Sequence, residues 1–374
     1  MTQSESPPPQ DRAHSNPESA EVDIGKRKNW LFSIGTILLF FLILEILFRL
    51  YYRPLPPPHL QAFINPEWQE DTVFLTDSIL FWRFIPSRTI EGRSRENGRY
   101  DIVINKDGYR GREWDEEIID EQGDRVLVIG DSCVFGWDVP EGKNFPERLM
   151  VRLSQSPKFQ DRPPILFQRG VPGYTSHQAL TVLREWGPKI QPDWIVLYLG
   201  TNDCIPCVNK NDRTIAEETK EPFLQPAIQR SHAALALRDF ILLVAKNLLI
   251  ERDYNSTVDF QTSPARVPLD HFEENLADFV NYASDAKSRL ILLTRQNATP
   301  NPRLETYNEK IREVGDAHGI PVVDVAARLV DYASSEVYAH PDWDPIHPNA
   351  KGYDLIAEWT AEAMFGQVEE QEGI

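Results

Sequence analysis

The sequence predicts an α/β protein: a three-layer α/β/α sandwich around a five-stranded parallel sheet, preceded by one transmembrane helix. Two observations support this prediction. After residue 124, five short apolar runs alternate with helical segments, and parallel strands that are covered on both faces have this character. A longer apolar run lies near the N-terminus, and its length matches the thickness of a bilayer.

The N-terminal part divides into a polar tail and an apolar helix. Residues 1–28 are rich in Ser, Pro, Glu and Gln, a composition that predicts a disordered tail. Residues 29–50 are mostly Leu, Ile and Phe, and Glu45 is the single ionisable residue between Trp30 and Phe48. At about 1.5 Å per residue, this run spans the roughly 30 Å of a bilayer core. A signal peptide would end in small residues, so the prediction is a transmembrane anchor.

Charge predicts the orientation of this helix and excludes one class of partner. The basic residues at 26–28 directly precede the helix, and the positive-inside rule then predicts a cytoplasmic N-terminus. The large C-terminal portion would lie outside the cytoplasm, on a single-pass membrane protein. The formal net charge of -18 argues against nucleic-acid binding, which needs a basic surface.

Residues 51–120 are predicted to be a connector that carries a small β element. The segment begins with several prolines, alternates weakly between apolar and polar residues at 100–105, and continues with Lys-Asp-Gly at 106–108. That tripeptide is a turn signal, so a hairpin-like element that packs on the main domain is expected.

Residues 121–374 are predicted to form the main domain. Short apolar runs predict its strands at 126–129, 165–167, 194–199, 290–293 and 322–325. The intervening patterns predict helices at 145–153, 178–186, 271–287 and 349–364.

An insertion at about 205–265 interrupts this alternation. It contains an apolar helical segment at 233–250 that is too charged to span a membrane. Two interpretations remain open: the segment packs on the body of the domain, or it forms a lid or a membrane-lying helix.

A serine follows the first predicted strand, which ends in Gly-Asp-Ser at 130–132. A serine at the carboxyl end of a strand and the start of a helix is well placed as a nucleophile, with its own N–H aimed at a developing oxyanion. The second glycine of the G-x-S-x-G elbow is missing, which disfavours an α/β-hydrolase. Ser132 is the candidate nucleophile, although Gly-Asp-Ser alone is also common in surface turns.

Two further strand ends carry candidate oxyanion donors. The second predicted strand leads into Gly170-Val-Pro-Gly173, where a glycine lets the backbone approach a reacting carbonyl closely. The third leads into Gly-Thr-Asn-Asp at 200–203, where the amide of Asn202 can donate to an oxyanion or cap a helix.

An Asp-His pair near the C-terminus supplies the candidate base. Asp344 and His347 are three residues apart, so the carboxylate can reach Nδ1 and leave Nε2 facing the serine. Asp342 and His340 are weaker candidates for the same two roles, and the spacing favours Asp344 and His347.

The remaining histidines and the cysteines are not assigned to the site. His177, His271 and His318 lack a partner at useful spacing and are expected to be structural or exposed. Cys204 and Cys207 form a C-x-x-C pair without further ligands at matching spacing, so a local disulfide or two free thiols are preferred over a metal site.

The four motifs together resemble the SGNH/GDSL hydrolase superfamily over about 124–365. The resemblance implies a flavodoxin-like fold, Ser132 as nucleophile, Gly173 and Asn202 as oxyanion donors beside the Ser132 N–H, and Asp344 with His347 as the dyad. The stretch at 105–110 is similar to one upstream of this domain in bacterial membrane-anchored members. Gln168 stands where the family often has Asn, which leaves Gly170 as a rival to Gly173.

The resemblance implies a serine esterase at the cell envelope that requires no metal or organic cofactor. Acetyl esters on glycans and acyl esters of lipids are the expected substrates. The alternatives are an acyltransferase that acts on an envelope polysaccharide and a catalytically silent binding module.

Overall fold

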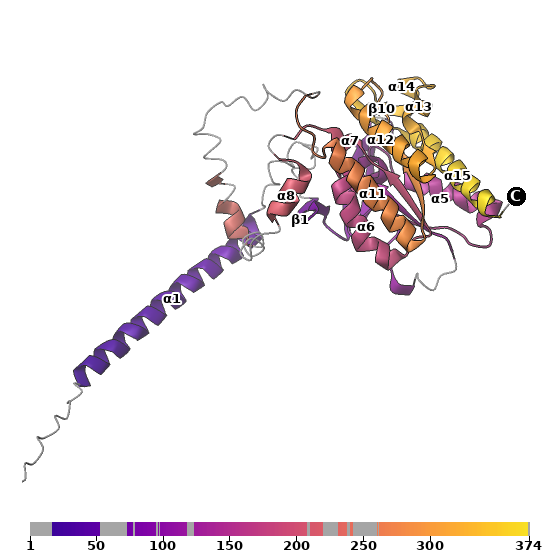
Figure 1. The fold of residues 1–374 in the computed structure, drawn as a ribbon. Helices are drawn as coiled ribbons and strands as arrows, with labels where there is room; N and C mark the ends of the chain where they lie inside the picture. The colour runs from indigo at the N-terminus through magenta and orange to yellow at the C-terminus, as the bar shows by residue number, and fades with distance from the viewer. Residues whose placement is uncertain are drawn as a thin grey trace, which may run out of the picture. The chain divides into compact units, whose positions relative to one another are not determined.

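The structure is a computed structural model (Figure 1), and it describes residues 17–52, 73–77, 79–94, 96, 98–117, 123–207, 210–219, 231–237, 240–241, 260 and 262–372. The chain forms two compact units. The first, called the helix unit here, comprises residues 1–55 and 226–250, and the second, called the sheet unit, comprises residues 56–225 and 251–374.

The helix unit contains α1, Pro17–Tyr51. Its part from Phe32 to Tyr51 has a mean hydropathy of 2.2 over 20 residues and is long and apolar enough to cross a membrane, as a span or a signal sequence would be. The helix begins at Pro17 rather than at residue 29, so residues 17–28 of the expected disordered tail are helical. Proline at the first helical position and the Glu, Ala and Lys residues that follow favour this early start. The remainder of that tail, residues 1–16, lies outside the described residues.

The sheet unit is built on five parallel strands in the order β6-β5-β7-β8-β9. This result confirms the predicted fold class. The strands are β5 (Arg125–Gly130), β6 (Ile165–Gly170), β7 (Trp194–Tyr198), β8 (Arg289–Leu293) and β9 (Val322–Val323).

Two hydrophobic clusters cover the two faces of the sheet. Because side chains alternate along a strand, Leu127 and Ile129 of β5 belong to one cluster, and Val126 and Val128 belong to the other. Helices α6 and α11 lie side by side over the first cluster, and α5 packs on α15 over the second (Figure 1). The main helices are α5 (Phe145–Gln155), α6 (Ser176–Ile190), α11 (Leu269–Ala286), α12 (Pro302–His318) and α15 (Ala350–Glu372).

The connector region forms two antiparallel hairpins, one from β1 (Phe74–Asp77) and β2 (Phe81–Phe84), the other from β3 (Arg88–Ser94) and β4 (Gly98–Ile104). The first hairpin packs on the main domain through Trp82. Its indole Nε1 donates to the Pro172 carbonyl at 3.1 Å, and its own carbonyl accepts from the Tyr174 hydroxyl at 2.6 Å. The first hairpin therefore supports the loop that follows β6.

The ends of the insertion are held together by backbone hydrogen bonds. The N–H of Arg266 donates to the Ile205 carbonyl, and the N–H of Cys207 donates to the Pro264 carbonyl, both at 2.8 Å. The insertion is thus closed at its base. The smaller elements are α4 (Ser132–Phe135), a 3₁₀ turn (Pro157–Phe159), α7 (Thr201–Cys204), α8 (Asp212–Thr219), α13 (Val325–Leu329), α14 (Ser334–Val337), β10 (Tyr338–His340) and β11 (Asp344–Pro348).

Candidate active site

The candidate nucleophile is the first residue of α4 and follows β5 directly. Asp131 caps this short helix by accepting a hydrogen bond from the Cys133 N–H at 2.9 Å. A side chain at Gly130 would lie 2.4 Å from Val134 and 2.5 Å from the Tyr198 carbonyl, so only glycine allows this tight passage from strand to helix. The packing therefore fixes where the Ser132 hydroxyl lies.

The structure brings Ser132, His347 and Asp344 into one hydrogen-bonded row. The Ser132 hydroxyl lies 2.7 Å from Nε2 of His347. Nδ1 of the same ring lies 2.6 and 2.8 Å from the two Asp344 carboxylate oxygens. With Nδ1–H donating to the carboxylate, Nε2 is free to accept from the hydroxyl. All three residues are at least nine-tenths buried.

Electrostatics and packing both fix this row. Burial acts to raise the pKa of Asp344, but its hydrogen bond to His347 and the charge of that ring outweigh burial, so the pKa lies below its usual value. The indole of Trp137 stacks on the imidazole, with ring centroids 5.3 Å apart and planes at 22°. The carboxylate thus stays ionised, and the imidazole is held in one plane.

Arg110 fixes the loop that carries Trp137. This arginine is fully buried and donates to the carbonyls of Phe135, Gly136 and Val139 at 3.0–3.1 Å. It also forms an ion pair of 2.9 Å with Glu141. The stretch at 105–110, which the sequence analysis compared with membrane-anchored family members, therefore supports the candidate site through Arg110.

The two weaker candidates lie outside the row. Asp342 is exposed. His340 has its Nε2 3.8 Å from a carboxylate oxygen of Asp138, whose pKa burial raises to about 6. The three-residue spacing thus selected the Asp-His pair that the fold brings to the serine.

The candidate oxyanion donor Asn202 is close to the row but is engaged by other groups. The amide nitrogen of Asn202 donates to Asp131 and to the Tyr174 carbonyl, both at 3.0 Å. Gly173 has φ +81°, a conformation that favours glycine. A side chain at Gly170 would lie 2.5 Å from the Phe135 backbone nitrogen, so close packing of α4 on β6 explains this glycine.

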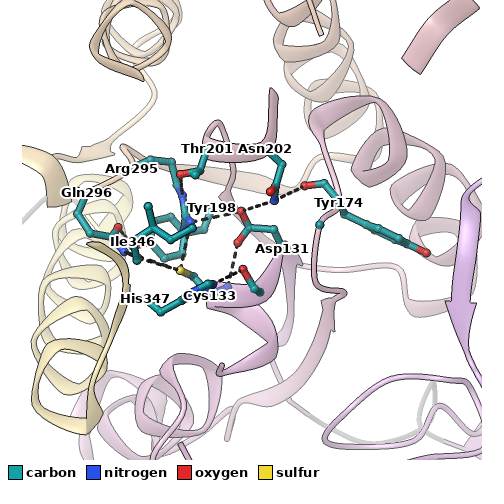
Figure 2. Close-up of polar contacts among 12 residues, drawn as sticks. Asp131, Cys133, Tyr174, Tyr198, Thr201, Asn202, Arg295, Gln296, Ile346 and His347 are labelled. Atoms are coloured by element: carbon teal, nitrogen blue, oxygen red, sulfur yellow. Dashed lines mark hydrogen bonds and ion pairs between the residues drawn. The ribbon is translucent and has the colours of Figure 1, made fainter. Parts of the chain in front are cut away.

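Sequence reasoning missed a buried polar network that joins the two halves of the site (Figure 2). Arg295 follows strand β8, which is the neighbour of β7 in the sheet, with Thr294 between them. Its side chain is fully buried. Its Nη2 lies 3.3 Å from an Asp131 oxygen and 3.1 Å from the Cys133 sulfur. Its Nε donates to the Thr201 hydroxyl at 3.0 Å. Arg295 thus contacts the residues on both sides of Ser132.

Gln296 extends the network to the base. Its amide nitrogen donates to the Ile346 carbonyl at 2.6 Å, and its amide oxygen accepts from the Tyr198 hydroxyl. Because Ile346 precedes His347, Arg295 and Gln296 link the nucleophile and base segments (Figure 2). The sequence signal was only a polar pair after a strand.

Charges in this network are stabilised by one another. Burial acts to lower the pKa of Arg295, but the Asp131 carboxylate together with the other groups around the guanidinium outweighs burial and raises the pKa. Burial also raises the pKa of Cys133 to about 11, so this thiol stays protonated at neutral pH. The guanidinium and the carboxylate therefore form a buried ion pair beside a neutral thiol.

No group of three or more His, Cys, Asp and Glu residues that could hold a metal occurs within the described residues. Cys204 and Cys207 are both free, and Cys204 is buried. Of the two arrangements expected for this pair, the structure has the free thiols.

Comparison with known proteins identifies the class. The family model of the GDSL-like lipase/acylhydrolase family matches residues 128–355, and the chain belongs to this family. It is a hydrolase that acts on ester bonds. Comparison with curated proteins found no match.

Three similar solved structures are distant in sequence. LAE5, an alpha/beta hydrolase enzyme from the metagenome of Lake Arreo, Spain, is 20% identical over 65% of this chain and 95% of its own, with a TM-score of 0.42. The lipase/acylhydrolase from Enterococcus faecalis is 17% identical over 65% and 96%, with a TM-score of 0.42. An acetylxylan esterase from Geobacillus stearothermophilus, in a catalytic mutant, is 16% identical over 66% and 94%, with a TM-score of 0.38.

Proposed function

We propose that this hydrolase is a membrane-anchored serine esterase with Ser132 as nucleophile, His347 as general base and Asp344 as its orienting acid. The observation that carries the proposal is the unbroken row from hydroxyl to imidazole to carboxylate, with contacts of 2.7 and 2.6 Å. A weak hydroxyl becomes nucleophilic when a positioned base can take its proton as attack proceeds.

The reaction follows from this geometry. Ser132 attacks the acyl carbonyl while His347 takes the hydroxyl proton, and Asp344 stabilises the resulting imidazolium. The imidazolium then gives its proton to the leaving alcohol, and an acyl-enzyme remains. Water, activated by the same imidazole, releases the acid and regenerates the serine.

The oxyanion is assigned to the N–H groups of Ser132 and Gly173 and to the amide of Asn202. A preorganised donor contributes about 3–4 kcal/mol to the transition state, and a donor that must first give up another acceptor contributes less. Since both hydrogens of the Asn202 amide have acceptors in the resting enzyme, this donor exchanges its contact with Tyr174 or Asp131 for the oxyanion during the reaction.

The location is also a proposal. A single N-terminal span with the basic residues 26–28 inside the cell places the hydrolase outside the cytoplasm. Ester substrates at that place are acetyl groups on envelope glycans and acyl groups of lipids.

The test is active-site labelling of the full chain in detergent with a fluorophosphonate probe. We expect labelling of the wild type and of Ser335→Ala, a control at an exposed serine, and none of Ser132→Ala. Turnover of a soluble acetyl ester should fall by about 10⁴-fold or more in Ser132→Ala and His347→Ala, since these residues act as a unit. An adduct that persists in Ser132→Ala would refute the assignment.

A further inference from the structure

Glu45 is the one carboxylate within the apolar part of α1, and it has an unusual set of partners. Its oxygens accept from the Ser231 hydroxyl at 2.8 Å and from the backbone N–H groups of His232 and Ala233, both at 3.1 Å. Arg49 adds an ion pair of 2.7 Å. All four residues belong to the helix unit, so part of the 205–265 insertion meets the candidate membrane span.

If α1 spans a bilayer, these contacts determine how deep residues 231–233 lie in it. Glu45 lies six residues before Tyr51, where the apolar stretch ends, which is about 9 Å along a helix. Nδ1 of His232 lies 3.4 Å from the Tyr52 carbonyl oxygen, just past that end. If α1 spans a bilayer, residues 231–233 therefore lie within the roughly 5–10 Å layer where amphipathic helices bury their apolar face.

The alternative, with Glu45 outside the bilayer, leaves too short a span. The basic residues at 26–28 mark the other end of the helix. Residues 29–44 would then cover about 24 Å, less than the roughly 30 Å of a hydrocarbon core. A carboxylate at the inner position needs hydrogen-bond donors, because unpaired charges are costly there. The insertion supplies three of them.

The exposed side chains of this segment are apolar, as contact with lipid requires. Residues 232–237 are helical, and Leu235 is 9% exposed, whereas Leu237, Phe240 and Ile241 are 59%, 62% and 55% exposed. Large apolar side chains with such exposure next to an apolar helix indicate a surface that another apolar phase covers. On α1 itself, Leu50 is also 70% exposed.

We propose that residues 231–237, with 240 and 241, form a membrane-surface segment that docks on Glu45 and inserts Leu237, Phe240 and Ile241 among the lipid acyl chains of the outer leaflet. The chain then contacts the membrane at two places, the span and the insertion. This inference rests on the proposed membrane span. For the described part of the helix expected at 233–250 it favours a membrane-lying element; residues 238–239 and 242–250 lie outside the described residues.

The experiment uses the full chain in phosphatidylcholine vesicles that contain a doxyl-labelled lipid as quencher. An environment-sensitive fluorophore is attached to Phe240→Cys, to Leu39→Cys on the span, or to Val330→Cys as an exposed control in the sheet unit. Every variant also carries Cys207→Ser, because Cys207 is the native thiol that is not fully buried. We expect quenching at positions 240 and 39, and none at 330.

Two outcomes overturn the proposal, and they differ. Quenching at 39 without quenching at 240 leaves the span intact and refutes the membrane-surface segment. No quenching at 39 refutes the span itself.

Glu45→Ala tests the docking contact. We expect it to reduce quenching at 240 while quenching at 39 persists, and Glu45→Gln, which keeps an acceptor for the two N–H groups, to restore part of the loss. Unchanged quenching at 240 in Glu45→Ala would refute the role of Glu45.

Discussion

Replacing Arg295 by methionine should destabilise the sheet unit strongly, because it leaves the Asp131 carboxylate buried without its cation. Both side chains are fully buried and 3.3 Å apart. Removing one partner of such a pair costs about 3–5 kcal/mol. Asp131 keeps hydrogen bonds from Cys133 and Asn202, so we expect a loss near the lower limit, about 3 kcal/mol.

Thermal unfolding of the full chain in detergent, followed by tryptophan fluorescence, measures this loss. A loss of about 3 kcal/mol lowers Tm by roughly 6–12 °C in a domain of 150–250 residues. Because the sheet unit is larger, we expect a shift of about 6 °C or less. Arg328→Met removes an arginine whose ion pair is half exposed and should change stability by less than about 0.5 kcal/mol.

A double variant separates the lost charge pair from the lost packing. Asp131→Asn combined with Arg295→Met removes both charges, so it should be more stable than Arg295→Met alone. A Tm for Arg295→Met equal to that of Arg328→Met would refute the reasoning, and so would a double variant whose two losses simply add.

Two further predictions concern carboxylates. Asp344→Asn should lower kcat on a soluble ester by about 10⁴-fold, since the amide cannot hold the productive His347 tautomer; a loss below tenfold would contradict the assigned role. Burial raises the pKa of Asp203 to about 7, above the roughly 3.9 of an unfolded chain, so its contribution to stability is fully present below pH 4 and is lost as pH rises through 7. Asp203→Asn should therefore gain stability relative to wild type between pH 4 and 7, and Tm curves that run parallel over this range would contradict the buried, protonated carboxyl.

The sheet could be predicted from sequence because its strands are short apolar runs that need no polar face. The predicted strand at 165–167 is shorter than β6, which continues to Gly170. The prediction stopped early because Gln168 and Arg169 are polar, although both are buried. Helix α12 was not predicted. Its buried residues Leu304, Tyr307 and Ile311 have helical spacing, but Glu, Lys and Arg residues surround them and weaken the pattern.

The site was predictable to the extent that its residues follow strands in recognisable motifs. Ser132 was predicted from its place after a strand, and Asp344 and His347 from their three-residue spacing. The structure has these three candidates in one hydrogen-bonded row. Arg295 and Gln296 belong to no motif, and their importance arises from contacts with residues more than 40 positions away along the chain. Such contacts exist only after folding, so a single sequence does not reveal them.

The closed base of the insertion makes the intervening segment exchangeable. Hydrogen bonds between 205–207 and 264–266 hold the two ends side by side, and the buried ion pair of Asp212 with Arg266 ties α8 to the same base. Beyond α8, a change in loop length alters chiefly the closure entropy, by about 0.6 kcal/mol per doubling. Segments of other lengths can therefore replace the residues after α8 without moving the sheet, and a protein engineer could give the same hydrolase a different second membrane contact, or none.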